Sequence, residues 1–180
     1  DGQWLHHPFD GDGMITAIKF KNGKASFTNK FVKTEGFLKE QKVDKFLYRG
    51  VFGSQKKGGV INNAFNLNLK NIANTHVIKL GDELLALWEA AGPHSLDPNN
   101  LETNGLTTLK GVLKKNEAFS AHPKVDFNSN SADEVLITFG VQTGPTSTIR
   151  LMEFSNSGKN SGQILFDRKD KLKGFAFLHD

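Results

Sequence analysis

The sequence contains no cysteine, and this absence removes several classes of chemistry at once. Without thiols the chain has no disulfide framework, no thiolate nucleophile and no cysteine-ligated metal. Any metal must therefore be held by histidine, aspartate or glutamate. Tyrosine occurs once and proline five times, whereas phenylalanine occurs fifteen times. Two explanations of this excess stay open on composition alone: packing of β-rich cores, or a pocket for a long apolar ligand.

Long apolar runs and a charge of one sign are missing as well. No stretch approaches the ~20 apolar residues that span a bilayer. Lysine and arginine number 23 against 19 acidic residues, a net charge of +4, and the lysines are scattered among acids and asparagines. We therefore expect no nucleic-acid partner. The proportions of 37% apolar and 23% charged residues are those of an ordinary globular protein.

Strand signals dominate the chain. Short β-type runs occur in pairs that flank turn residues such as Asn22-Gly23 and Gly81-Asp82. The pairs are residues 15–20 with 25–34, 75–80 with 83–90, and 148–155 with 162–169, and residues 134–143 add a further strand. No stretch keeps a helical apolar spacing over three turns, so helices are expected to be nearly absent. An all-β sandwich, barrel or propeller follows, with a long polar loop at 54–71.

Three polar residues are candidates for chemistry. Glu89 ends an apolar strand, where a carboxylate is either a solvated strand end or a hydrogen-bond acceptor, and the residues alone favour the solvated end. His122 precedes a proline, and its distance from His179 matches no local metal motif. In the closing stretch GFAFLHD, Phe175, Phe177 and His179 alternate, which predicts a strand with all three side chains on one face.

Six stretches, taken together and in order, resemble the signature segments of the carotenoid cleavage oxygenase family, and most of all its bacterial and cyanobacterial members. They are FDGDGM, FVKTEGF, LKNIANTHV, LLALWE with LDPNNLET, AFSAHPKVD and GFAFLHD. The resemblance implies a seven-bladed β-propeller built of antiparallel four-stranded blades, with one non-haem Fe(II) held by four histidines. Members of the family use O2 to split a conjugated double bond into two carbonyl products.

The resemblance also implies roles for individual residues. His122 and His179 are expected to be two of the iron ligands, and Glu89 to accept a hydrogen bond from a ligand imidazole. Thr75 is expected near the open side of the iron. Neutral imidazoles leave the metal its full charge and free positions for O2, and an acceptor behind a ligand ring fixes its orientation. Phe177 and Trp88 are expected to line the approach of an apolar polyene, which offers almost no groups for hydrogen bonding.

The same resemblance makes residues 1–180 an incomplete β-propeller domain. We expect an N-terminal segment and the C-terminal half to lie outside it, together with the third and fourth iron ligands, so that the piece alone is inactive. The expected partners are a carotenoid or apocarotenoid and O2. The expected compartment is the cytoplasm, where the full-length protein either stays in solution or contacts a membrane peripherally.

Three other functions stay open. Within the same chemistry, the family includes enzymes that cleave stilbene-like phenylpropanoids. A vertebrate branch isomerises retinyl esters without cleavage. From a different class, the chain is a noncatalytic β-propeller-derived binding module if it ends at Asp180.

Overall fold

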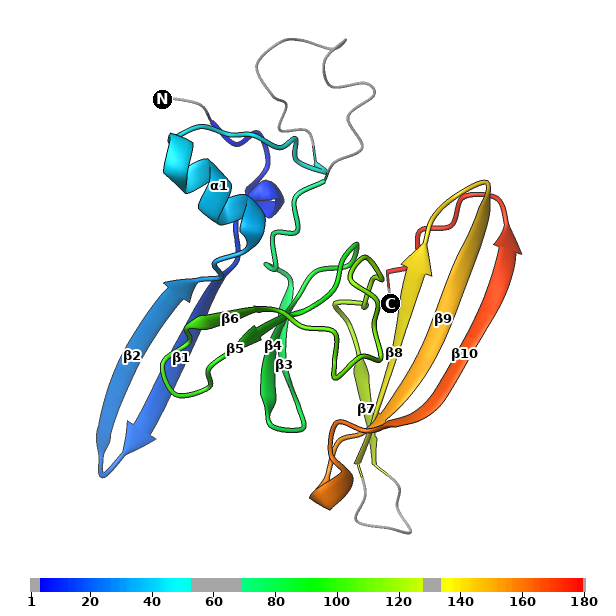
Figure 1. Ribbon diagram of the computed structural model, residues 1–180. Coiled ribbons are helices and arrows are strands. Elements are labelled where there is room, and N and C mark those ends of the chain that lie inside the picture. Colours follow the sequence, from blue (N-terminus) through cyan, green and yellow to red (C-terminus); the bar gives the residue numbers. More distant parts are fainter. Residues whose placement is uncertain (1–3, 53–68, 128–133, 180) are drawn as a thin grey trace.

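Three antiparallel sheets follow one another along the chain in the computed structural model, which describes residues 4–52, 69–127 and 134–179 (Figure 1). The first is a hairpin of β1 (Met14–Lys21) and β2 (Lys24–Phe31). The second has the order β3-β4-β5-β6, with bounds His76–Leu80, Glu83–Leu87, His94–Leu96 and Thr103–Leu106. The third has the order β10-β9-β8-β7, and from β7 to β10 the bounds are Lys124–Phe127, Glu134–Gln142, Thr146–Ser155 and Ile164–Lys173. The expected four-stranded antiparallel sheets are therefore present.

The hairpins lie where the turn residues predict them. Asn22 and Gly23 join β1 to β2 with φ angles of 51° and 72°, and Gly81 has a φ of 61° between β3 and β4. A short 3-10 turn, Gly158–Asn160, separates β9 from β10. Sequence reasoning missed β5, β6 and β7, which have only three or four residues each. Strands this short show no alternation and are defined by their pairing with neighbours.

Helices are nearly absent from the described residues, as expected, and the one α-helix, α1 (Glu35–Val43), was not predicted. The hydroxyl of Thr34 caps it by accepting a hydrogen bond from the Phe37 amide at 3.1 Å, and Asp44 ends it with a φ of 51°. Its nine residues make only about two and a half turns, too few to establish a periodic apolar pattern. Thr34 could have indicated the start of this helix, because threonine is a favoured N-cap residue.

A buried cluster of charges connects α1 to the segment just before β1. The ammonium of Lys70 lies 2.6 Å from Asp12 and 2.5 Å from Glu40, a residue of α1. Burial raises the pKa of Asp12 above its ordinary value, against the opposing effect of Lys70. Removing one member would leave an uncompensated charge in the interior. The long loop predicted at residues 54–71 lies mostly outside the described residues.

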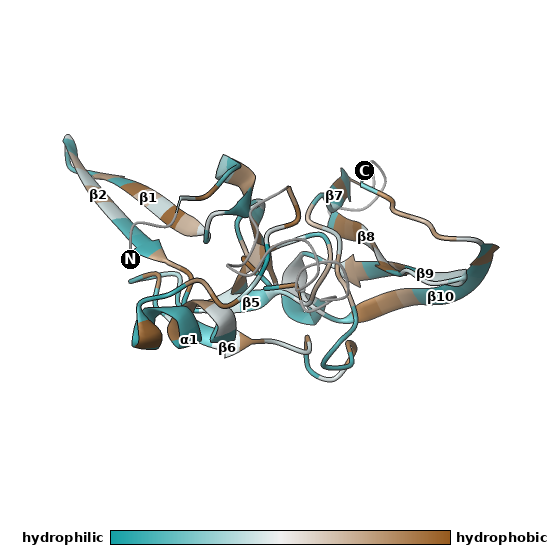
Figure 2. Ribbon diagram, turned by 90° about the horizontal axis from the view of Figure 1, so that it is seen from above, coloured by the Kyte–Doolittle hydropathy of each residue, from teal (hydrophilic) through white to brown (hydrophobic). Residues whose placement is uncertain are grey.

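Two apolar cores join the three sheets into one stack. The larger core lies between the second and third sheets and includes Leu85, Leu87 and Phe154, each fully buried. The smaller one contains Val32, next to β2, and Ala86 of β4. Strand β4 therefore contributes alternate residues to two cores. Seen from above, the β1–β2 hairpin and strands β8–β10 lie at opposite ends of the molecule, with β5 between them (Figure 2).

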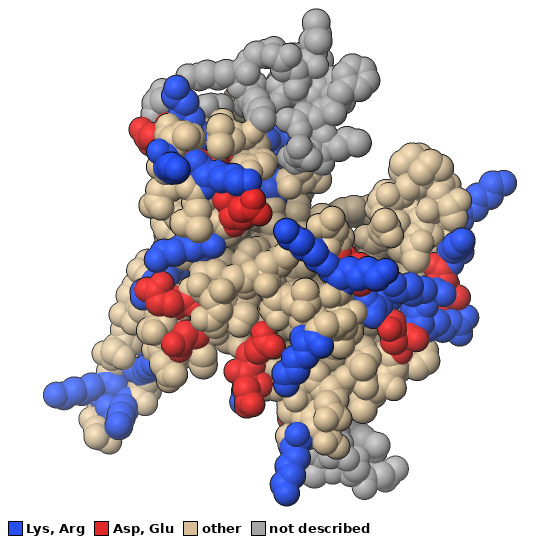
Figure 3. All heavy atoms as spheres, in the orientation of Figure 1, with Lys and Arg blue, Asp and Glu red and all other residues tan. Residues whose placement is uncertain are grey.

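Basic and acidic side chains lie side by side on the face shown in Figure 3. Among the described residues, Lys39 forms an ion pair with Glu35 on α1 at 2.5 Å, and Arg150 of β9 forms one with Asp167 of β10 at 2.8 Å. Within the described part of the chain, no helix has the length and apolar character needed to cross a membrane.

Candidate metal centre and substrate cavity

Glu89 is carried into the interior by strand β4. Leu85 and Leu87 are fully buried in the larger core, and the chain continues through Trp88, which is also buried, to Glu89. The Glu89 side chain keeps only 9% of its exposure. The solvated strand end that the residues alone favour is therefore wrong. Strand β4 packs against a core on each face, and the Glu89 side chain that follows it is largely removed from solvent.

His122 is held in a loop whose preceding residues are buried. Its amide donates to the hydroxyl of Ser120 at 3.1 Å, and the Ser120 amide donates to the carbonyl of Phe139 in β8 at 2.7 Å. The carbonyl of Ala121 accepts a hydrogen bond from Nδ1 of His76 at 2.9 Å. A carbonyl only accepts, so His76 carries its proton on Nδ1. These contacts fix the backbone from which the His122 ring projects.

His179 lies at the end of a segment that is tied to the turn between β8 and β9. The Ser147 hydroxyl donates to the Gly174 carbonyl at 2.8 Å and accepts from the Ala176 amide at 2.9 Å, and the Thr143 hydroxyl donates to the Ala176 carbonyl at 2.8 Å. Residues 175–179 form no strand, so the predicted strand is wrong. Side-chain hydrogen bonds, in place of a strand ladder, position this segment.

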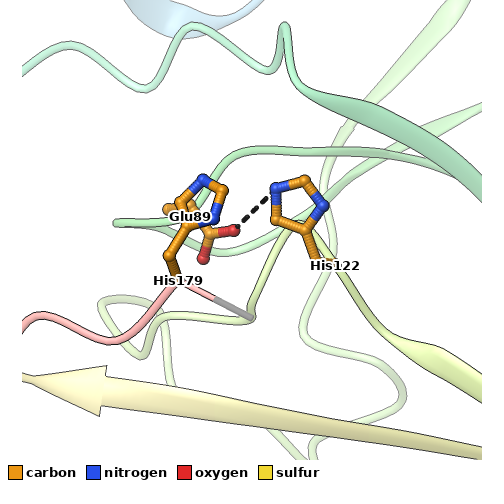
Figure 4. A group of neighbouring side chains, drawn as sticks. All are labelled: Glu89, His122 and His179. Atoms are coloured by element: carbon orange, nitrogen blue, oxygen red, sulfur yellow. Dashed lines mark ion pairs between the residues drawn. The ribbon is translucent and has the colours of Figure 1, made fainter.

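Glu89, His122 and His179 come together although they lie far apart in the sequence (Figure 4). One ligand atom from each lies within 4.8 Å of the others. The Nε2 atom of His122 is 3.4 Å from Oε1 of Glu89, and the rings of His122 and His179 have centroids 4.5 Å apart. The tertiary structure thus joins β4, the loop before β7 and the segment after β10 at one point.

The unsatisfied atoms of this cluster fit a metal. Both carboxylate oxygens of Glu89 and the Nε2 atom of His122 are buried without a hydrogen-bond partner. Buried polar atoms in native proteins are nearly always paired, so unpaired ones need an explanation. Imidazole nitrogens with a carboxylate suit iron, zinc, copper or nickel. The donor set and its unpaired atoms therefore fit the predicted transition metal.

The cluster lies in the wall of a cavity of about 640 Å³ whose surface is mainly apolar. All six residues selected from the sequence line it: Thr75, Trp88, Glu89, His122, Phe177 and His179. The sequence did not point to the others, which include Phe9, Val51, Phe52, Leu69 and Asn74. Phe9 and Phe52 pack edge to face with centroids 5.6 Å apart. No local pattern marks these residues, because their place at the cavity depends on distant segments.

His76 is a further residue that sequence reasoning left without a role. Besides its hydrogen bond to Ala121, its ring stacks beside that of His122 with centroids 6.4 Å apart. It therefore supports the loop that presents His122. A histidine directly after Thr75 was visible in the sequence, but only the fold shows which loop it contacts.

Successive four-stranded antiparallel sheets beside an apolar cavity are the architecture of part of a β-propeller, and the imidazole and carboxylate cluster in the cavity wall fits a metal site. Residues 1–180 match the family model described as retinal pigment epithelial membrane protein, and the chain belongs to this family. The resemblance to carotenoid cleavage oxygenases inferred from the sequence is thereby confirmed.

Individual relatives agree with this assignment. The chain is 47% identical over 179 residues to an apocarotenoid-15,15'-oxygenase of Synechocystis, covering 98% of the chain and 36% of the relative. It is 38% identical over 121 residues to resveratrol cleavage oxygenase 1 of Aspergillus fumigatus, covering 66% of the chain and 22% of the relative. The structure of the cobalt-substituted Synechocystis enzyme superimposes with a TM-score of 0.89 at 46% identity, covering 98% of the chain and 36% of that chain. The chain thus spans little more than a third of its Synechocystis relative, and the predicted propeller fold is confirmed over that span.

Proposed function

We propose that the protein to which this chain belongs is a metal-dependent oxygenase that cleaves a conjugated double bond of a carotenoid or apocarotenoid. Both atoms of O2 are consumed, and one becomes the carbonyl oxygen of each product. The observation that carries the proposal is the group of Glu89, His122 and His179 in the wall of a mainly apolar cavity. We also propose that residues 1–180 are part of one larger β-propeller domain.

Three residues of this chain would hold and orient the metal. His122 and His179 would each donate an imidazole nitrogen, with Fe(II) as the metal. Glu89, 3.4 Å from His122, would accept a hydrogen bond from a ligand ring and fix its rotation. Fe(II), when bound, supplies redox chemistry with O2. The remaining two ligands would come from residues outside positions 1–180.

The cavity would bind the polyene and position its reacting bond. Trp88 and Phe177 would contact the substrate through their rings, since a polyene offers almost no hydrogen-bonding groups. A substrate packed along these rings would keep water away from the metal and hold one double bond near it. Thr75 would lie beside the reacting bond.

The substrate would enter from an apolar environment. Phe9 and Phe52 line the cavity and yet are 61% and 53% exposed. Exposed aromatic side chains around an apolar opening suit contact with a lipid surface. A peripheral membrane contact of the full-length protein is therefore part of the proposal.

The test is a cleavage assay with the full-length protein loaded with Fe(II). An apocarotenal and a hydroxystilbene are supplied in parallel with ¹⁸O2, and the products are analysed by mass spectrometry. We expect two carbonyl products from the apocarotenal, each with one labelled oxygen when exchange with water is corrected for. Absence of products from a protein with stoichiometric iron would overturn the proposal.

A stilbene substrate is the second candidate, because the match to resveratrol cleavage oxygenase 1 covers two thirds of the chain. Faster cleavage of the hydroxystilbene than of the apocarotenal in the same assay would favour it. Both substrates require the same metal site, so the His122→Ala variant is the control for either. Binding of a polyene without any cleavage would instead favour a binding module.

A further inference from the structure

The side-chain amide of Asn74 is held by two backbone carbonyls at the edge of the cavity. Its Nδ2 atom donates to the carbonyl of Phe9 at 3.0 Å and to that of Gly11 at 2.9 Å. Both amide protons are therefore used, and both partners can only accept. A rotated amide would place its oxygen against two carbonyl oxygens. The orientation of the Asn74 amide is thus determined, with Oδ1 turned away from the carbonyls of Phe9 and Gly11.

That oxygen accepts a hydrogen bond from the neighbouring hydroxyl. Oγ1 of Thr75 donates to Oδ1 of Asn74 at 3.2 Å. Amide oxygens only accept, and a hydroxyl has a single proton, so Thr75 has none left for any other partner. Thr75 and Asn74 both line the cavity. What Thr75 offers there is a methyl group and the lone pairs of its oxygen.

The backbone around the pair is held from both sides. The Thr75 amide donates to the Leu87 carbonyl at the end of β4, and the Gly13 amide donates to the Ile72 carbonyl, at 3.1 Å and 2.8 Å. A Cβ atom on Gly13 would lie 2.0 Å from the carbonyl oxygen of Ala73, so this approach requires glycine. Ala73 has a φ of 45°, in the left-handed region that alanine rarely adopts. Asn74 and Thr75 therefore have little freedom to exchange partners.

We propose that Asn74 is a positioning residue: its amide oxygen accepts the hydrogen bond of the Thr75 hydroxyl, so that Thr75 offers the cavity an acceptor but no donor. The proposal rests on the oxygenase function proposed above and adds a specificity to it. Carbonyl products only accept hydrogen bonds, so they find no donor at Thr75. Alcohols and water, which donate, can still be bound there.

The consequence can be measured as a preference between two ligands. If Asn74 is removed, the Thr75 hydroxyl can rotate and donate into the cavity. Binding of an aldehyde should then improve relative to the corresponding alcohol by roughly three- to tenfold, the range that one hydrogen bond supplies. The product aldehyde should inhibit the variant more strongly, and kcat should fall because release of that product is slower.

The experiment is a double-mutant cycle in the full-length protein. Asn74→Ala is made alone and in the Thr75→Val background, where no hydroxyl remains. The probes are the aldehyde product of the cleavage assay and the alcohol obtained from it by borohydride reduction, and their Kd values are measured by fluorescence quenching. Thermal unfolding of the metal-free variants is a second readout that does not depend on turnover.

Asn71→Ala is the matched control, because Asn71 holds the same segment without touching Thr75. Its amide donates to the Gly92 carbonyl at 2.8 Å and its oxygen accepts from the Ala73 amide at 3.2 Å. We expect Asn74→Ala to change the aldehyde-to-alcohol ratio only where Thr75 is present. Asn71→Ala should leave the ratio unchanged in both backgrounds.

Two results would overturn the inference. One is an equal shift in the ligand ratio for Asn74→Ala with and without the Thr75 hydroxyl, and the other is a shift of the same size for Asn71→Ala. If the wild-type protein shows no cleavage, the proposed function fails instead, and a commercial apocarotenal with its alcohol serves as the probe pair. The coupling of Asn74 and Thr75 in thermal unfolding then still tests the hydrogen bond itself.

Discussion

The Nε2 atom of His122 lies 3.4 Å from Oε1 of Glu89, and both atoms are buried without a hydrogen-bond partner. Two groups that each need a partner thus face one another at ion-pair distance without forming a hydrogen bond. His179 places a second ring 4.5 Å from that of His122 on the same side of the cavity. A metal ion held by the two imidazoles, with Glu89 beside them as a hydrogen-bond acceptor, would account for the unpaired atoms of Glu89 and His122.

Replacing either histidine should remove the metal. In the full-length protein, we expect His122→Ala and His179→Ala to abolish stoichiometric iron and cleavage, because each variant loses one donor of the site. Iron is measured by plasma mass spectrometry and folding by circular dichroism. His6→Ala is the control, since His6 is outside the cluster. Full activity of folded His122→Ala would contradict the assignment.

Glu89→Gln should weaken the site without destroying it. Glutamine keeps the shape and an acceptor oxygen but loses the charge that holds a ligand ring. We expect metal affinity or activity to fall about 10–100-fold, as for other partners of ligand histidines. The Kd for Fe(II) is measured by competition with a chelator. A loss as complete as that of His122→Ala would instead make Glu89 a direct ligand.

Phe177→Ala should raise KM for a polyene substrate by roughly tenfold, because about 1.4 kcal/mol of apolar contact is lost. Phe175 is the matched control, since it is 76% exposed against 72% for Phe177 and is absent from the described cavity lining. Phe175→Ala should leave KM near its wild-type value. Equal effects of the two substitutions in steady-state kinetics would remove Phe177 from the substrate site. Trp88→Phe, which keeps a ring, should have a smaller effect than Phe177→Ala.

His94 should make stability depend on pH. It is 4% exposed, and burial lowers its pKa from 6.5 to about 4. The unfolded chain binds this proton more readily, so the contribution is constant above pH 6.5 and stability falls as the pH drops from 6.5 towards 4. At pH 5 the loss is about 2 kcal/mol. Urea unfolding at pH 5 and 7.5 should show a smaller difference for His94→Leu than for the wild type. Equal differences would show that His94 does not titrate as described.

Local turn chemistry explains why the hairpins were predictable. Asn22 and Gly23 adopt positive φ angles at low cost, and Gly81 does the same between β3 and β4. These turns act over two residues and need no tertiary partner. Strand β5, by contrast, is a strand only because β4 and β6 pair with it. Helix α1 was missed because its nine residues are too few for a periodic pattern.

The candidate site was predictable in its members but not in its environment. Six separate stretches together resemble one family, and from them came His122, His179 and Glu89 as site residues. The burial of Glu89 contradicted the interpretation from the residues alone, because it depends on cores on both faces of β4. The roles of His122 and His179 as metal ligands and of Glu89 as hydrogen-bond acceptor stay predictions. The expected cytoplasmic location stays a prediction as well.

The sequence by itself determined the strand-rich composition, the tight turns, the exclusion of thiol chemistry and the family, because each depends on residue types and short-range spacing. Only the tertiary structure decided that Glu89, His122 and His179 meet, and that the Asn74 amide oxygen accepts the hydrogen bond of the Thr75 hydroxyl. Those relationships depend on the packing of successive sheets and on hydrogen bonds to Phe9 and Gly11, more than sixty positions away. Contacts over such separations follow from the fold as a whole and leave no pattern in any one stretch of sequence.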